Sequence, residues 1–308
     1  MEKKAFLSVV IPVYNNFGSL KKSYVQLESV LSEFPNKEVI FVNDGSKDDS
    51  LQELLGLKQE AENVKIIDFS RNFGQIPATT AGIRSAKGDV VIVVSADLQD
   101  PISLMPELIS NIKNGFDIVI AYRKDRDEGV IKKITSRIYF KMLKYHTKAE
   151  VPDGGFDYFL LTRSAANALN RIDNKIRGLH YDILSLGFNI KYIPYGRVKR
   201  TIGKSQYNFL KRFNDFSNAF ISISFLPIRA MILTGIIFAA LGFVYAASII
   251  RAWFMGNTPF QGWAPIMVLL LVIGGILMIM IGVVGEYIWR IYEEIKDRPK
   301  YIIKKQYD

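Results

Sequence analysis

Acidic and amide side chains directly follow two short apolar runs in the first half of this 308-residue chain. Asp44 follows the run that ends at residue 43, and Asp97, Gln99 and Asp100 follow the most apolar run of the region, which ends at residue 95. Carboxylates with a side-chain amide suit a hard cation such as Mg²⁺ or Mn²⁺ that bridges a diphosphate. Helix capping before residue 102 is the interpretation we favour for Asp100 alone.

Asp44 lies in an Asp-Gly-Ser segment with two possible uses. Its carboxylate could accept hydrogen bonds from a base or a ribose, and Gly45 would permit close backbone approach. Asp-Gly-Ser is also ordinary turn chemistry, so this segment alone leaves both uses open.

Common nucleotide motifs do not account for these residues. The chain has no G-x-G-x-x-G segment. Residues 203–205 resemble the end of a phosphate-binding P-loop, but Val198 stands where the motif requires glycine, far from an early strand–loop–helix. Hydride transfer and P-loop ATP hydrolysis are therefore excluded.

The elements that must position these residues alternate as strands and helices, which predicts an α/β fold with a mostly parallel sheet. We expect strands over 6–13, 39–43, 64–68, 90–95 and 118–122, and helices over 18–32, 50–62, 75–86, 102–113 and 130–145. Ligands of such sheets bind beyond the carboxyl ends of the strands. The segments to inspect are therefore 14–16, 43–46, 70–72 and 95–97.

Two uncharged apolar runs, 231–250 and 264–285, each have about the 20 residues that cross a hydrocarbon core. A buried hairpin in a soluble core is the alternative, but soluble cores rarely contain two such runs in tandem. We predict an integral membrane protein. The 251–263 connector has one basic residue, Arg251, whereas the flanking regions are rich in Lys and Arg, so both termini should be cytoplasmic.

The net charge of +10 is concentrated beside the predicted spans. Seven Lys or Arg residues lie between 197 and 229 against one acid, Asp215, which indicates attraction to anionic lipid headgroups. No motif supports nucleic-acid binding. Large apolar residues recur at helical spacing over 207–223, which favours an interfacial helix over core packing. The chain has no cysteine, which excludes disulfides and thiolate metal sites.

Segments 9–15, 43–46, 70–74 and 96–101 occur in this order at suitable spacings, and together they resemble family 2 glycosyltransferases with the GT-A fold. The closer resemblance is to polyisoprenyl-phosphate glycosyltransferases, relatives of dolichol-phosphate mannose synthase. It extends through 200–205, 225–229 and 282–287 to 298–301, and so covers nearly the whole chain.

This resemblance implies a UDP-sugar donor, a polyprenyl phosphate acceptor and an Mg²⁺ or Mn²⁺ cofactor. The implied nucleotide-sugar site comprises Pro12, Tyr14, Asn16, Asp44, Arg71 and Asp97. The implied metal ligands are Asp97 and Gln99, and the implied catalytic residues are Asp97 and Asp157, with Asp153 as the rival to Asp157. The implied lipid-phosphate site comprises Arg123, Arg126, Ser136, Arg200 and Lys204, although for each of these basic residues a solvated surface position is the alternative.

One departure from the family pattern concerns the metal motif. Most relatives carry two carboxylates there, whereas this chain has Ser95 at the first position. The change removes one negative charge and one hard ligand, so the cation should bind more weakly unless the donor diphosphate supplies oxygens.

We therefore expect an inverting glycosyltransferase that moves a sugar, glucose above all, from a UDP-sugar to undecaprenyl phosphate at the cytoplasmic face of a bacterial plasma membrane. The expected domains are a GT-A catalytic domain over 1–206, an interfacial helix region over 207–229, a two-helix anchor over 230–287 and a cytoplasmic tail over 288–308. The sequence leaves open whether the protein forms a homo-oligomer. The alternatives are a nucleotide-sugar-binding scaffold without turnover and a polysaccharide synthase, although two spans make a poor conduit and no Gln-x-x-Arg-Trp motif occurs.

Overall fold

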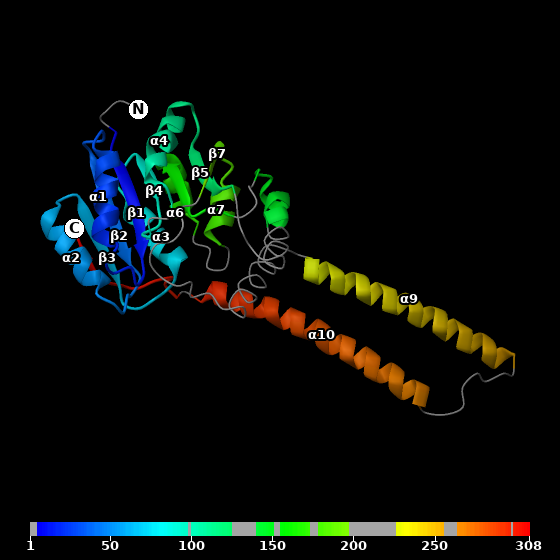
Figure 1. Ribbon diagram of the computed structural model, residues 1–308. Helices are drawn as coiled ribbons and strands as arrows, with labels where there is room; N and C mark the ends of the chain where they lie inside the picture. Colours follow the sequence, from blue (N-terminus) through cyan, green and yellow to red (C-terminus); the bar gives the residue numbers. More distant parts are fainter. Residues whose placement is uncertain are drawn as a thin grey trace. The chain divides into compact units, whose positions relative to one another are not determined.

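The computed structural model of the protein describes residues 5–97, 100–124, 140–150, 155–172, 178–196, 226–255, 264–296 and 298–308. The chain divides into two compact units (Figure 1). The first comprises Met1–Ala219 with Arg298–Asp308, and the second comprises Phe220–Asp297.

The first unit is built on a mostly parallel sheet, as the sequence predicts. Its strand order is β7-β5-β6-β4-β1-β2-β3-β8, and β6 and β8 run antiparallel to their neighbours. The strands are β1 (Leu7–Val13), β2 (Lys37–Asn43), β3 (Val64–Phe69), β4 (Val90–Val93), β5 (Ile118–Arg123), β6 (Tyr158–Thr162), β7 (Ile190–Tyr195) and β8 (Ile303–Tyr307).

Helices cover both faces of this sheet (Figure 1). One face packs against α1 (Leu20–Leu31), α2 (Ser50–Glu60), the short 3₁₀ helix η1 (Ile102–Leu104) and α4 (Met105–Lys113). The other carries α3 (Gln75–Ser85) and α6 (Arg163–Asn170), which contact each other. A further short helix, α7 (Leu179–Ser185), precedes β7.

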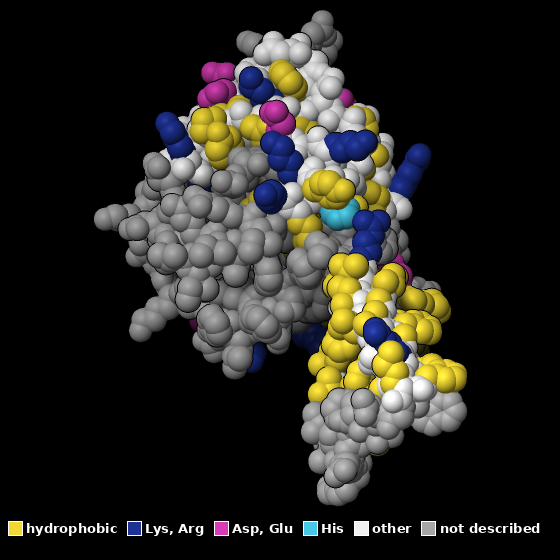
Figure 2. All heavy atoms as spheres, turned by 90° about the vertical axis from the view of Figure 1, so that its right-hand side faces the viewer, with side chains coloured by type: hydrophobic (Ala, Val, Ile, Leu, Met, Phe, Trp, Pro, Cys, Tyr) yellow, Lys and Arg dark blue, Asp and Glu magenta, His cyan; other side chains and the backbone are white. Residues whose placement is uncertain are grey.

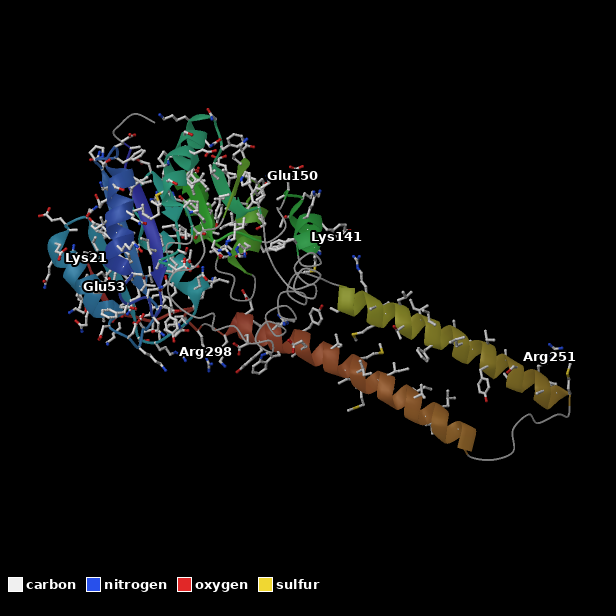
Figure 3. All side chains as sticks on the ribbon, viewed as in Figure 1. Lys21, Glu53, Lys141, Glu150, Arg251 and Arg298 are labelled. Atoms are coloured by element: carbon white, nitrogen blue, oxygen red, sulfur yellow. The ribbon has the colours of Figure 1, made fainter. Side chains whose placement is uncertain are left out.

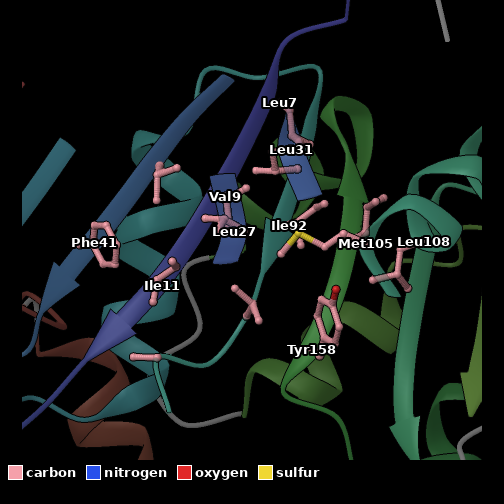
Figure 4. Close-up of a cluster of buried hydrophobic side chains, with 14 of the residues drawn as sticks. Leu7, Val9, Ile11, Leu27, Leu31, Phe41, Ile92, Met105, Leu108 and Tyr158 are labelled. Carbon is pink, nitrogen blue, oxygen red and sulfur yellow. The ribbon is translucent and has the colours of Figure 1, made fainter. Parts of the chain in front are cut away.

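Strand β1 shows why the central strands are continuously apolar. Leu7, Val9 and Ile11 point to the face covered by α1 (Figure 4). Val10 points to the opposite face, where a Cβ on Gly82 of α3 would lie 2.2 Å from its Cγ1 atom. Both faces of the strand are therefore buried, which a parallel sheet requires.

The five strands that the sequence predicts are confirmed within two residues at each end, and helices α1, α2 and α3 begin and end close to their predicted limits. The predicted helix over 102–113 is divided into η1 and α4. Of the helix predicted over 130–145, the described part from residue 140 onward is helical. The interfacial helix predicted over 207–223 lies outside the described residues.

The second unit contains two long apolar helices, α9 (Leu226–Phe254) and α10 (Ala264–Ile295). Ile228–Ala252 and Val272–Ile295 are long and apolar enough to cross a membrane, and none of the apolar windows is buried. Figure 2 shows their described side chains as a nearly continuous hydrophobic surface, and Figure 3 shows Arg251 near the end of α9. The alternative of a hairpin buried in a soluble core is therefore not supported.

The chain returns to the first unit after α10. Arg298, labelled in Figure 3, precedes β8, and β8 pairs antiparallel with β3 so that Tyr307 lies opposite Ile66. The sheet edge at β3 is thus completed by the last residues of the sequence.

The end of the sheet at which β1 starts contains a buried acid, Glu38, which is 2% exposed. Its carboxylate accepts hydrogen bonds from the Ser8 hydroxyl at 2.5 Å and the Lys87 N–H at 2.6 Å, and it lies 2.8 Å from Lys65 Nζ. Burial raises the pKa of Glu38, but these hydrogen bonds and the Lys65 charge together lower it below its ordinary value.

Replacing Glu38 by Gln should lower the free energy of unfolding by about 1.5–3 kcal/mol at pH 7, because hydrogen bonds to a buried charge are lost. The folded-state pKa is depressed, so the difference from wild type should be full above pH 4.5 and should disappear as the pH falls through the folded-state pKa. Denaturant unfolding at several pH values measures it. Glu60→Gln, in a surface pair with 59% exposed side chains, is the control and should change stability little.

Candidate functional site

The loops that follow β1 and β2 are tied together at the carboxyl edge of the sheet. The Asn15 N–H donates to Ser46 Oγ at 3.0 Å, and the Lys47 N–H donates to Asn15 Oδ1 at 2.9 Å. Asn15 has a φ of 52°, a left-handed conformation that Asn tolerates better than most residues. The segments 14–16 and 43–46 therefore form one surface, as the sheet topology requires.

The Asp44 carboxylate binds the loop that follows β3. It is 3% exposed and accepts the N–H of Phe73 at 2.7 Å, the N–H of Gly74 at 2.9 Å and the side-chain amide of Asn72 at 2.9 Å. Burial raises the pKa of Asp44, and the two backbone N–H groups oppose that rise. Asp44 thus fixes the 70–74 loop, and a direct contact from Asp44 to a ligand stays a prediction.

Gly45 allows the 70–74 loop to approach the end of β2. Its φ is 60°, and a Cβ at this position would lie 2.3 Å from the carbonyl carbon of Arg71. A side chain would collide with backbone, which cannot easily yield. Gly45 therefore permits the close backbone approach that the sequence predicts.

The other residues expected at a nucleotide-sugar site lie on the same edge. Pro12 and Tyr14 are partly exposed, and the Asn16 side chain accepts the Tyr14 N–H at 3.0 Å. Arg71 is exposed, with its guanidinium carbon 4.8 Å from the centre of the Phe73 ring. Arg71 is therefore held at the surface by an aromatic ring and faces solvent.

Asp100 does not cap a helix, so that prediction is wrong. The helix η1 has Pro101 at its N-cap, without a side-chain cap, while Asp100 is 1% exposed. Its carboxylate accepts hydrogen bonds from Ser95 Oγ and, at 2.5 Å, from Tyr195 Oη. Ser95 Oγ also lies 3.0 Å from Asp97 Oδ1. Ser95 therefore links the predicted metal ligand Asp97 to a buried carboxylate.

Arg123 lies between two acids, with a side chain that is 16% exposed. Its Nη2 atom is 3.4 Å from Asp157 Oδ2 and 3.9 Å from Asp100 Oδ1, and its Nε–H donates to Tyr195 Oη at 3.3 Å. Burial lowers the pKa of Arg123, but Tyr195 and the two acids raise it by more. The guanidinium is therefore charged and joins the two predicted catalytic acids, Asp97 and Asp157, through one network.

Asp157 is placed by the start of β6. The carbonyl oxygen of Phe156 accepts a hydrogen bond from the ring Nε2 of His180 in α7 at 2.5 Å, and Tyr158 is fully buried. The Asp157 carboxylate between them is 38% exposed and accepts a hydrogen bond from Gln75 at 3.5 Å. Two buried neighbours therefore hold an acid that is partly exposed to solvent.

The structure thus brings Asp97, Arg123 and Asp157 together and adds Asp100 and Tyr195, which the sequence analysis did not assign to the site. The sequence did indicate a role for Asp100 at the site, because this residue lies in the same acidic segment as Asp97. It gave no such indication for Tyr195. The remaining expected residues, Gln99, Arg126, Ser136, Asp153, Arg200 and Lys204, lie outside the described residues.

The described residues fit a divalent cation in part. Asp97 offers carboxylate oxygens at a partly exposed position, which suits Mg²⁺ or Mn²⁺. No group of three or more His, Cys, Asp or Glu side chains that could hold a metal occurs among the residues described. The weaker cation binding expected from Ser95 in place of a carboxylate stays a prediction.

Comparison with known proteins agrees with this geometry. Residues 8–169 match the protein family described as "Glycosyl transferase family 2". An uncharacterized glycosyltransferase of Synechocystis is 35% identical over 96% of this chain and 94% of its own length. The bactoprenol glucosyl transferase of Shigella phage SfII is 33% identical over 98% of both chains.

Solved structures show the same fold. Glucosyl-3-phosphoglycerate synthase of Mycobacterium tuberculosis, in complex with Mn²⁺, UDP-glucose and phosphoglyceric acid, superposes with a TM-score of 0.50 at 16% identity. The match covers 71% of this chain and 79% of the synthase chain. The GT-A-like architecture of the first unit is therefore established, independently of any ligand.

Replacing Tyr195 by Phe should lower the free energy of unfolding by about 1–3 kcal/mol, because buried Asp100 loses a hydrogen-bond donor. Tyr192→Phe is a matched control on the same strand: the Tyr192 hydroxyl is buried, with no hydrogen-bond partner among the described residues. Its loss should be nearly neutral. Denaturant unfolding of both variants measures the difference, and equal losses would contradict the role given to Tyr195.

Proposed function

We propose that this chain, which belongs to glycosyl transferase family 2, moves glucose from UDP-glucose to undecaprenyl phosphate. The observation that carries the proposal is the full-length similarity to a bactoprenol glucosyl transferase, which includes the two apolar helices. A glycosyltransferase with two candidate spans suits an acceptor that resides in a bilayer and a donor that is dissolved in water.

The connectivity supports a hairpin that crosses the membrane twice. Residues before α9 and residues after α10 belong to the same folded unit, since β8 pairs with β3. A chain that crosses once could not return to complete that sheet. With the basic residues on the flanks and a connector that holds only Arg251, the positive-inside rule places the sheet on the cytoplasmic side of the plasma membrane.

The donor binds at the ends of β1, β2 and β3 in this proposal. Pro12, Tyr14 and Asn16 border the nucleoside, and Arg71 approaches the same nucleotide from the 70–74 loop. Asp44 fixes that loop through Phe73 and Gly74. The fold neighbour that holds UDP-glucose and Mn²⁺ supports this choice of donor.

Asp97, with Gln99, would hold Mg²⁺ or Mn²⁺ at the end of β4. A cation there would neutralise negative charge on the donor diphosphate as the sugar departs. A carboxylate at position 95 would place a second negative charge beside buried Asp100. Ser95 instead donates a hydrogen bond to Asp100, so charge repulsion is not added to the cost of burying that acid.

The acceptor needs positioning more than activation. A phosphate monoester has its second pKa near 6, so it is largely dianionic at neutral pH. A phosphate oxygen forms a bond to the anomeric carbon as the bond from that carbon to UDP breaks, and UDP leaves with the electron pair, which inverts the configuration. Arg123 holds the phosphate, Asp157 orients the guanidinium, and Arg126, Ser136, Arg200 and Lys204 complete the acceptor site.

Purified protein given radiolabelled UDP-glucose, undecaprenyl phosphate and Mn²⁺ should produce organic-extractable label. Asp97→Asn should reduce this transfer by about 100-fold or more, because charge stabilisation at the diphosphate is lost. Asp89→Asn is the matched control. Asp89 directly precedes β4, at the end of the strand opposite to Asp97, and its carboxylate accepts a hydrogen bond from the Phe6 N–H. A panel of other nucleotide sugars belongs to the same assay. Binding of a donor without lipid product from any of them would favour a scaffold without turnover.

Replacing Asp44 by Ala should weaken UDP binding by about 1–3 kcal/mol, because the 70–74 loop loses the acceptor of its N–H groups. Calorimetry with full-length protein measures the affinity. Asp68→Ala is the control: Asp68 is equally buried, and its carboxylate accepts a hydrogen bond from the side-chain amide of Asn43. If both variants bind UDP as wild type does, Asp44 has no part in the donor site.

A further inference from the structure

The segment that follows the second candidate span lies against the loop that carries Arg71. The carbonyl of Ile302 accepts the Ser70 N–H at 3.0 Å. The Tyr301 ring stacks on the Phe69 ring, with centres 5.0 Å apart and planes inclined by 10°. The resemblance noted for 298–301 gave these residues no role, yet they contact the end of β3.

Aromatic contacts continue from Tyr301 to Arg71. The ring of Phe69 meets the ring of Phe73 edge-on at 5.7 Å, and the Arg71 guanidinium carbon lies 4.8 Å from the centre of the Phe73 ring. Each contact is of a kind that contributes about 0.5–1.5 kcal/mol. An unbroken series of ring contacts therefore joins the C-terminal segment to a cation of the candidate donor site.

The other side of the same loop is held by Asp44 and Gly45. Asp44 accepts hydrogen bonds from the N–H groups of Phe73 and Gly74, and the Arg71 backbone lies so close to Gly45 that a Cβ there would collide with it. The 70–74 loop is thus fixed from two directions, by residues near position 45 and by residues near position 301.

The pairing of β8 with β3 changes register at this place. Lys305 lies opposite Asp68, whereas Ile303 lies opposite Phe69, so one residue of β8 is extra. Such bulges bend a strand and redirect the side chains beside them, and they occur often next to functional sites. The regular ladder therefore ends where contact with the 70–74 loop begins.

We propose that Tyr301 is a positioning residue of the donor site: its ring, through Phe69 and Phe73, sets where Arg71 meets the nucleotide part of the donor. The inference rests on the proposed function in assigning a nucleotide sugar to this edge. The C-terminal segment is then a component of the donor site, and the domain that binds the donor is incomplete without the residues that follow α10.

Tyr307 distinguishes positioning from general support of the sheet edge. It lies at the end of β8, six residues after Tyr301, where it pairs with Ile66 and packs against the core, away from the 70–74 loop. A merely structural role for β8 predicts equal effects of Tyr301→Ala and Tyr307→Ala. Positioning predicts that Tyr301→Ala alone changes the loop.

The experiment compares full-length wild type with Tyr301→Ala, Tyr301→Phe and Tyr307→Ala. Hydrogen exchange at the Phe73 and Gly74 amides should speed up in Tyr301→Ala only, because these amides report the position of the loop on Asp44. The Kd of UDP and the KM of UDP-glucose should rise about 3- to 10-fold in Tyr301→Ala, with an unchanged KM for undecaprenyl phosphate. Tyr301→Phe keeps the ring and should restore wild-type values.

Equal exchange at the 70–74 loop in Tyr301→Ala and Tyr307→Ala would overturn the proposal, as would a Tyr301→Phe variant as impaired as Tyr301→Ala. Failure of the proposed function has a different signature. If wild type binds neither UDP nor UDP-glucose, the donor assignment is wrong, and the exchange measurement still decides whether Tyr301 positions the loop.

Discussion

The buried carboxylate of Asp100 determines how the side chains around it are arranged at the candidate site. A charge with 1% exposure is tolerated only when hydrogen bonds and an opposite charge replace the lost water. Ser95, Tyr195 and Arg123 supply them, from the ends of three different strands. Since the guanidinium also reaches Asp157, and Ser95 also contacts Asp97, the hydrogen bonds to Asp100 place the two candidate catalytic acids on one network. The hydrogen bonds and the charge that compensate the burial of Asp100 therefore also fix the geometry of the candidate site.

The donor side of the site depends on backbone contacts instead. Asp44 and Gly45 hold the 70–74 loop through its N–H groups and by close approach, and the Asn72 side chain adds a hydrogen bond to Asp44, whereas none of these contacts involves the Arg71 side chain. A loop fixed in this way can vary its exposed residues, such as Arg71, without losing its position. Substrate preference and loop geometry are thus separable in this fold.

Much of the fold could be predicted because the central strands are buried on both faces. Runs such as 90–93 are apolar without interruption, and polar residues mark their ends. Three strands were missed. Two of them are the edge strands of the sheet: β8 carries two lysines, and β7 contains Pro194, both of which are typical of edges. The third, β6, lies inside the sheet between β5 and β4. The role of Asp100 was hidden for a different reason. Its partners are Tyr195 and Arg123, which are distant in sequence, and Asp-Pro before a helix is typical of a cap.

Strand β8 also determines when the sheet of the first unit is completed during synthesis. Its partner β3 leaves the ribosome early, but β8 is made only after both apolar helices. At about 5–20 residues per second, translation leaves the β3 edge without β8 for roughly ten seconds or more. During that interval the sheet has an open edge, which can pair with another chain and so favours aggregation. The sheet of the first unit is therefore completed only after both apolar helices have been made.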